Sequence, residues 1–109
     1  MTAVNDDWSC VADATGLEAT GRMQVDVAGR RILLIQADGE HYACAAHCTH
    51  EHAELVDGLA ELGTIECPLH GAVFDLKTGA VHYGPADQPL PVFPCKVAGG
   101  RVWVQLKEK

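Results

Sequence analysis

Two short clusters of cysteine and histidine, sixteen residues apart, constrain this chain more than any other feature. The first cluster reads Cys48-Thr49-His50, and the second reads Cys67-Pro68-Leu69-His70. Thiolate sulfur and imidazole nitrogen are ligands that proteins use for zinc and for iron. In extended backbone the two ends of a C-x-H pair face the same way, and a tight turn does the same for C-x-x-H. The fold therefore has to bring two ligand loops together.

The charge of the chain narrows the class of protein. Eight Lys and Arg residues against 15 Asp and Glu residues give a formal net charge of −7. This balance argues against nucleic acid and against an anionic membrane, and it favours a partner with a basic surface. We see no secretory signal and no transmembrane span, so we expect a cytoplasmic protein. Five cysteines would leave one over in a disulfide framework, which favours metal ligation.

The 109 residues suffice for one domain with a modest core. Short runs with apolar alternation, separated by Gly and Pro turns, predict many short strands and no long helix. The strands are expected at 23–27, 32–35, 41–46, 64–66, 73–74, 81–83, 93–97 and 102–106. Residues 8–21 are expected to be irregular, and 53–59 to be mostly loop with a possible helical turn. The pattern is typical of an all-β fold.

The flanks of the second cluster carry a family resemblance. They read His70-Gly71, Phe74-Asp75 and Thr78-Gly79, followed by Gly84-Pro85 and Pro89-Leu90. Together with the C-x-H and C-x-x-H spacing, this run resembles the Rieske family, and the resemblance covers most of the chain. It implies stacked antiparallel sheets, with a cluster-binding subdomain of about 45–85 inserted into a basal part of about 1–44 and 86–109. Gly84-Pro85 would correspond to the proline loop that covers the cluster.

The resemblance also implies the cofactor and its ligands. Rieske proteins bind one 2Fe–2S cluster, with two Cys on one iron and two His on the other. Carried over to this chain, Cys48 and Cys67 would bind one iron, and His50 and His70 would bind the other. Gly71, directly after the last ligand, suits a position that needs positive φ or a close backbone approach.

The departures from the family pattern bear on the reduction potential. High-potential Rieske proteins add a disulfide between the two loops, but here the corresponding residues are Ala53 and Leu69. Those proteins also place Ser and Tyr hydroxyls near the cluster, where this chain has Ala72 and Phe74. Fewer hydrogen bonds stabilise the reduced cluster less, so we expect a low reduction potential of about −150 mV. The low-potential branch of the family includes the ferredoxins of bacterial aromatic-ring dioxygenases.

The remaining Cys and His residues leave one alternative open. Cys44 and His47 also form a C-x-x-H pair, so a structural zinc module is conceivable. A buried position in the core is the simpler interpretation of Cys44, because unpaired Cys is commonly buried. Cys10 and Cys95 are expected to be packing residues, and His52 a solvent-facing neighbour of the cluster.

The resemblance implies an electron carrier that is not itself an enzyme. It would take electrons from an NAD(P)H-dependent flavin reductase and pass them to the Rieske centre of a terminal aromatic-ring dioxygenase. The sequence has no nucleophile–base pair beyond the ligands, no phosphate loop and no flavin motif. One alternative keeps the cluster but changes the partner, as in the small Rieske-type subunit of an assimilatory nitrite reductase. The other is the zinc-binding interaction module.

Overall fold

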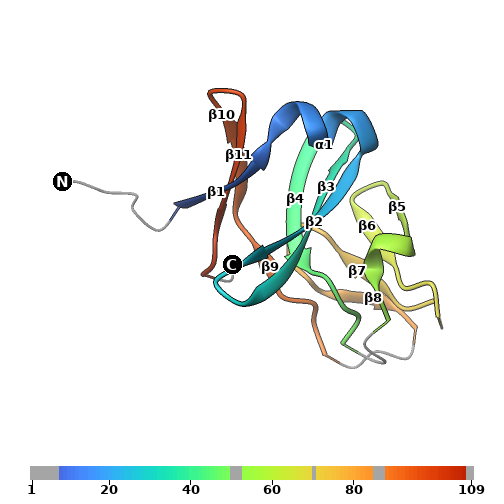
Figure 1. Cartoon of the computed structure of the whole chain (residues 1–109). Helices are drawn as coiled ribbons and strands as arrows, with labels where there is room; N and C mark the ends of the chain where they lie inside the picture. The colour runs from blue at the N-terminus through green and yellow to red at the C-terminus, as the bar shows by residue number, and fades with distance from the viewer. Residues whose placement is uncertain (1–7, 50–52, 70, 85–87, 108–109) are drawn as a thin grey trace.

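The computed structural model describes residues 8–49, 53–69, 71–84 and 88–107. These described residues form eleven strands, one α-helix and one short 3₁₀ helix (Figure 1). In chain order they are β1 Trp8–Asp13, α1 Ala14–Thr20, β2 Arg22–Val27, β3 Arg30–Ala37, β4 Glu40–Ala45, η1 Leu55–Asp57, β5 Leu59–Glu61, β6 Thr64–Glu66, β7 Val73–Asp75, β8 Val81–Tyr83, β9 Val92–Phe93, β10 Cys95–Ala98 and β11 Arg101–Gln105. The prediction of an all-β fold is confirmed.

The strands form three antiparallel sheets, and the sheet from β2 to β4 lies between the other two (Figure 1). Their orders are β1-β11-β10, β2-β3-β4-β9 and β5-β6-β7-β8. The apolar run Ile32 to Ile35 on β3 explains why this sheet lies in the middle. Ile32 and Leu34 face one hydrophobic core, whereas Leu33 and Ile35 face another. A strand covered on both faces needs apolar residues at consecutive positions instead of alternation.

The two cores define two sides of the molecule. The cysteine-side core lies between the middle sheet and the β5–β8 sheet. Its buried members are Leu33, Ile35, Tyr42, Cys44, Ala46, Cys48, Leu55, Ile65, Cys67, Ala72, Phe74, Leu76, Leu90 and Val92. The helix-side core lies under α1 and the β1–β11–β10 sheet. Its buried members are Ala14, Leu17, Ile32, Leu34, Ala43, Phe93, Val102 and Val104.

The prediction that residues 8–21 are irregular is wrong. Trp8–Asp13 forms β1, which pairs with β11 and is interrupted by a bulge between Cys10 and Ala12. Its sequence has no clean alternation, so the order of this strand comes from a partner about 90 residues further along the chain. Ala14–Thr20 forms α1, which is too short for a periodicity test. The helix buries Leu17 and ends at Gly21, whose φ is 82°.

Two further expectations change in detail. The segment 53–59 contains the 3₁₀ helix η1 and the start of β5, a strand that the sequence does not predict. The single strand expected at 93–97 is two strands, because Pro94 has no N–H to donate to a ladder. Val92–Phe93 pairs with β4 and Cys95–Ala98 pairs with β11, so the chain crosses between two sheets at this proline.

Within the described ranges, no helix is both long and apolar enough to pass through a bilayer. The division into a basal part of 1–44 and 86–109 and an inserted part of 45–85 stays a prediction. The β5–β8 sheet falls inside the range expected for the insert.

Candidate metal centre

The first cysteine loop leaves the end of β4. Cys48 is buried, with 1% of its surface exposed, and its N–H donates to the carbonyl of Ala53 at 2.9 Å. The N–H of Leu55 donates to the carbonyl of Ala46 at 2.9 Å, and His47 and Glu54 form a bridge between these two bonds. The loop is therefore closed by a short antiparallel ladder, which holds the Cys48 thiol toward the core.

The second cysteine loop connects β6 to β7. Cys67 is also 1% exposed, and its N–H donates to the carbonyl of Ala72 at 2.7 Å. The N–H of Gly71 donates back to the carbonyl of Cys67 at 3.1 Å. Gly71 has a φ of 78°, a conformation that other residues rarely adopt. The sequence-based expectation for this glycine is confirmed, and the tight turn aims the second thiol into the same core.

A third segment, which begins at Gly84, contacts both cysteine loops. Gly84 has a φ of 98°, and a Cβ added to it would lie 2.6 Å from the Cα of Ala72 in the second loop. The carbonyl of Gln88 accepts a hydrogen bond of 2.9 Å from the hydroxyl of Thr49 in the first loop. No sequence signal marks this bond, because its partners are 39 positions apart. Pro85 lies outside the described residues, so its role as a lid stays a prediction.

The wall behind the two thiols is apolar. Ala72 and Phe74 are fully buried in the cysteine-side core and present no hydroxyl. Cys44 is fully buried in the same core, and burial raises the pKa of its thiol to about 12. This side chain therefore stays a protonated packing residue at neutral pH. The expectation that Cys44 faces the core is confirmed.

The arrangement of Cys48 and Cys67 fits a shared metal cluster. Two loops far apart in the sequence bring both thiols into one buried core. Within the described residues, which include all five cysteines, none forms a disulfide. A bound metal ion would stabilise these two thiols as thiolates, which are the form of cysteine that ligates metals. His50 and His70, and also His52, lie outside the described residues, so the histidine half of the ligand set stays a prediction.

The other two cysteines differ from each other. Cys95 is half-buried and packs against the helix-side core, as expected. Cys10 is exposed, so its expectation as a packing residue is wrong. It lies opposite Trp103 on the outer face of the β1–β11–β10 sheet, and an Arg101 guanidinium nitrogen lies 3.9 Å from its sulfur. The bulge next to Cys10 shifts the register of β1, which the sequence does not reveal.

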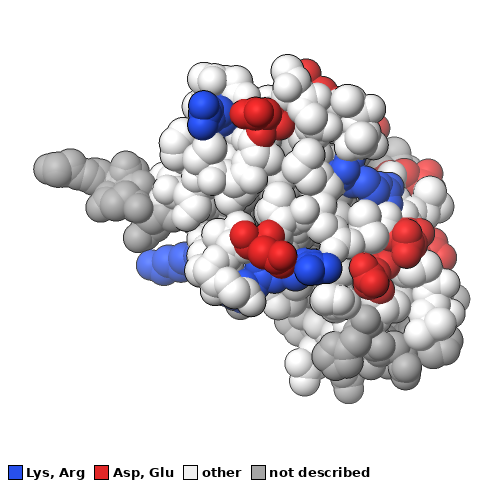
Figure 2. Space-filling model, viewed as in Figure 1, with Lys and Arg blue, Asp and Glu red and all other residues white. Residues whose placement is uncertain are grey.

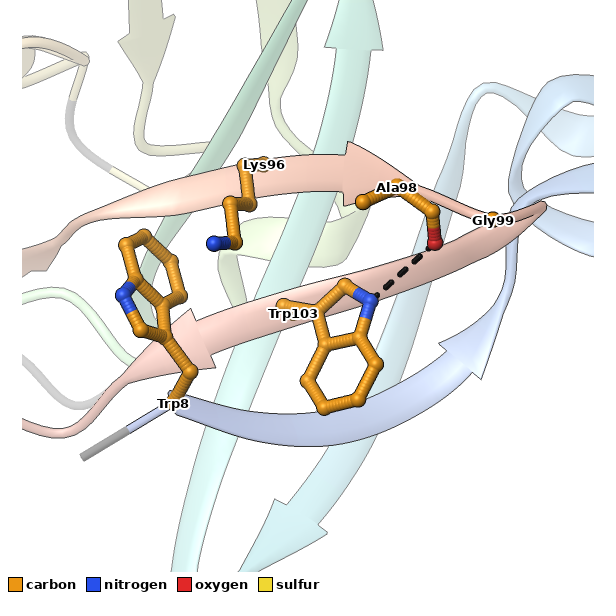
Figure 3. A pocket seen from close by; sticks show the side chains of 5 residues that line it. All are labelled: Trp8, Lys96, Ala98, Gly99 and Trp103. Carbon is orange, nitrogen blue, oxygen red and sulfur yellow. Dashed lines mark hydrogen bonds between the residues drawn. The ribbon is translucent and has the colours of Figure 1, made fainter. Parts of the chain in front are cut away.

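A hollow of about 420 Å³ lies on the β1–β11–β10 sheet, which does not carry either buried loop cysteine (Figure 3). Its walls include Trp8 and Trp103. The Lys96 ammonium lies 4.2 Å from the centre of the Trp8 ring, and the indole N–H of Trp103 donates to the carbonyl of Ala98 at 3.2 Å. These two contacts join the side chains of the hollow to one another and to β10.

The three sheets and the paired cysteine loops define a small all-β metal-binding domain. Residues 7–94 match the model of the Rieske [2Fe-2S] domain family. The ferredoxin component of the naphthalene 1,2-dioxygenase system of Pseudomonas aeruginosa is 40% identical over 82 residues, which are 75% of this chain and 79% of that protein. The 3-phenylpropionate/cinnamic acid dioxygenase ferredoxin subunit of Escherichia coli K12 is 42% identical over 78 residues, covering 71% and 74%.

A solved structure agrees with these relatives. It is the complex of reduced oxygenase and oxidized ferredoxin in carbazole 1,9a-dioxygenase, and one of its chains has a TM-score of 0.83 to this one at 31% identity. The alignment covers 96% of this chain and 98% of that chain. The chain belongs to the Rieske [2Fe-2S] domain family.

Membership of the family decides the nature of the cofactor. A Rieske domain binds a 2Fe–2S cluster, so the cofactor is one Rieske cluster and not a structural zinc ion. The resemblance to dioxygenase ferredoxin components is confirmed by the relatives above. These relatives are electron-transfer components, which agrees with a carrier and not with an enzyme.

Proposed function

We propose that this chain is a one-electron carrier of an aromatic-ring dioxygenase system. It receives electrons from an NAD(P)H-dependent flavin reductase and delivers them to the Rieske centre of the terminal oxygenase. The observation that carries the proposal is the placement of two buried cysteines, from two loops, in one core of a Rieske domain. Relatives named for naphthalene and phenylpropionate dioxygenase systems support the assignment to this class.

The proposed ligands are two kinds of side chain, one kind for each iron. Cys48 and Cys67 bind one iron as thiolates, and His50 and His70 bind the other as neutral imidazoles. The bound cluster supplies one-electron redox chemistry. The buried side chains of Ala72 and Phe74 exclude water from the thiol side. They offer no hydroxyl to the reduced state, which supports a potential near the lower end of the Rieske range.

The charge of the chain supports a docking role. Acidic side chains gather on the side of the molecule where η1 and β5 lie (Figure 2), and the net charge of −7 attracts a basic partner surface. Redox encounters usually bury less than about 1,200 Å² and are transient. We place the chain in the cytoplasm as part of the same proposal, since a system driven by NAD(P)H works where that cofactor is regenerated.

Reconstitution tests this function. We expect a flavin reductase and a terminal aromatic-ring oxygenase to couple NAD(P)H consumption to substrate oxidation only when this holoprotein is added. Electron transfer should slow as salt rises, because the Debye length falls from about 10 Å at 0.1 M to about 3 Å at 1 M. An oxygenase that turns over equally well without the chain would contradict the proposal. Efficient electron delivery to a nitrite reductase instead would favour the alternative.

A further inference from the structure

Arg22, the first residue of β2, contacts the segment between the two cysteine loops. Its guanidinium nitrogen Nη1 donates to the carbonyl of Val56 at 2.7 Å and to the carbonyl of Gly58 at 2.6 Å. Both hydrogen bonds are partly buried and join residues 34 and 36 positions apart. A charged donor makes stronger hydrogen bonds than a neutral one, so this contact firmly links the middle sheet to residues 55–58.

The segment that Arg22 holds is continuous with the first cysteine loop. Leu55 opens it, and its N–H bonds the carbonyl of Ala46 at 2.9 Å. Two residues earlier, the carbonyl of Ala53 accepts from the N–H of Cys48 at 2.9 Å. A displacement of residues 55–58 would therefore pull on the hydrogen bonds that position the Cys48 thiol.

The same segment packs directly against the approach to the second loop. A Cβ added to Gly58 would collide with the carbonyl oxygen of Glu66, the residue before Cys67. Gly58 has a φ of −83°, which any residue can adopt, so the close approach is what requires glycine. Leu59, the next residue, pairs with Glu66 across β5 and β6. Residues 55–58 thus connect both cysteine loops.

We propose that Arg22 is a positioning residue of the redox centre. By holding Val56 and Gly58 on the middle sheet, it keeps the Cys48 and Cys67 loops at the separation that the cluster requires. The inference rests on the proposed ligation by these two cysteines. The geometry of a functional site is held by the packing and hydrogen bonds of residues around it, and Arg22 is placed to give this support.

The test compares Arg22→Gln with Arg101→Gln in the holoprotein. Arg101 is an exposed arginine on the β1–β11–β10 sheet. Its variant therefore removes the same charge but leaves the hydrogen bonds from Arg22 to Val56 and Gly58 in place. Losing charged hydrogen bonds should speed amide exchange at Leu55 and Cys48 roughly tenfold in Arg22→Gln. Exchange at Val102 and Val104 should not change. Loss of the visible spectrum to a chelator should accelerate by a similar factor, and the electron paramagnetic resonance signal of the reduced cluster should broaden.

Two further variants keep the test decisive. Arg22→Lys retains a charged donor and should restore part of the slow exchange, including in the event that Arg22→Gln does not fold. Gly58→Ala disrupts the close approach of residues 55–58 to Glu66, and it should also speed the loss of the cluster to a chelator. Unchanged exchange at Leu55 in Arg22→Gln, or an equal effect in Arg101→Gln, would overturn the inference. A cluster that persists in Cys48→Ala would overturn the ligand assignment. Faster amide exchange in Arg22→Gln would, even then, support the role of Arg22 in holding residues 55–58 on the middle sheet.

Discussion

The middle sheet and the β5–β8 sheet are built in different ways. In the middle sheet, β2, β3 and β4 are 6, 8 and 6 residues long and pair along their whole length. In the β5–β8 sheet, which lies beside the cysteine loops, every strand has 3 residues. Strands this short give little stability of their own. The cysteine side therefore depends on other contacts to hold its shape.

The glycines show where those contacts lie. Gly58, Gly79 and Gly84 are on the cysteine side, and a Cβ added to any of them would collide with backbone of another segment. At the hairpin glycines Gly29 and Gly99, an added Cβ would meet nothing within 4 Å. The middle sheet is thus ordered by long ladders, and the cysteine side beyond it by close approaches of backbone to backbone. We infer that the bound cluster adds the remaining cross-link, because metal binding stabilises the folded loops that supply its ligands.

The acidic charge is concentrated in one part of the chain. The range 45–85 carries six acidic residues and a single basic one, so it accounts for most of the net charge of −7. The acidic residues are Glu51, Glu54, Asp57, Glu61, Glu66 and Asp75, and the basic residue is Lys77. The part of the chain that holds the proposed ligands is therefore also its most acidic part, which is consistent with the proposed docking on a basic partner surface.

The largest effect is expected from removal of a thiolate ligand. Cys48→Ala or Cys67→Ala should abolish the visible Rieske spectrum and speed amide exchange in the β5–β8 sheet, while exchange in β3 stays slow. The control is Cys44→Ala, which changes a buried thiol of the same core and should keep the spectrum. Loss of the cluster in Cys44→Ala would refute the ligand assignment.

The next largest effect is a loss of stability on replacing a glycine that has a positive φ. Gly84→Ala should cost about 3 kcal/mol, because it adds overpacking against Ala72 to the strain of a φ of 98°. Gly99→Ala, with a φ of 62° and open space around it, should cost only about 1 kcal/mol. Urea unfolding of both holoproteins measures the difference. Equal costs would mean that the close approach at Gly84 contributes nothing.

The reduction potential tests the apolar wall of the cysteine side. We expect voltammetry to give a reduction potential of about −150 mV. Phe74→Tyr places a hydroxyl where the family resemblance puts one near the cluster. A hydrogen bond of about 1 kcal/mol would raise the potential by about 40 mV. The control Phe93→Tyr lies in the helix-side core and should leave the potential unchanged. A wild-type value above about +100 mV would contradict the assignment to the low-potential branch.

The smallest expected effect is on the pH dependence of stability, and it comes from Asp75 at the end of β7. Partial burial acts to raise the pKa of Asp75, but hydrogen bonds from the N–H groups of Thr78 and Lys77, together with nearby His82, outweigh it and lower the pKa. A lowered pKa means that the stabilisation is fully present above about pH 4, the ordinary value of an Asp, and is lost as pH falls through the folded pKa.

Asp75→Asn should therefore cost about 1 kcal/mol at pH 7 and progressively less as the pH falls below about 5. Urea unfolding at a series of pH values measures this difference. Asp26→Asn is the control on β2, where the carboxylate makes an exposed ion pair of 3.1 Å with Arg31. Exposed pairs contribute little, so its cost should stay within about 0.5 kcal/mol. A cost of Asp75→Asn that does not depend on pH would contradict the role of the charged carboxylate.

The features that depend on neighbouring residues could be predicted from the sequence. The C-x-H and C-x-x-H spacing indicated the cysteine loops, Asp38-Gly39 marked the β3–β4 turn, and alternation placed β2 and β11. The requirement for glycine at position 71 was visible from its place in the motif. These features are readable because turn chemistry, ligand chemistry and strand alternation are local.

The way in which distant segments meet depends on tertiary packing. It ordered Trp8–Asp13 by pairing with β11, formed α1 over the helix-side core, and moved the chain between sheets at Pro94. It also brought Arg22 to Val56 and Gly84 to Ala72. Such contacts join positions that follow no shared period in the sequence, and their free energy exists only once both partners are packed. For this reason the ligand motif could be recognised in advance, whereas the contacts that hold its loops in place could not.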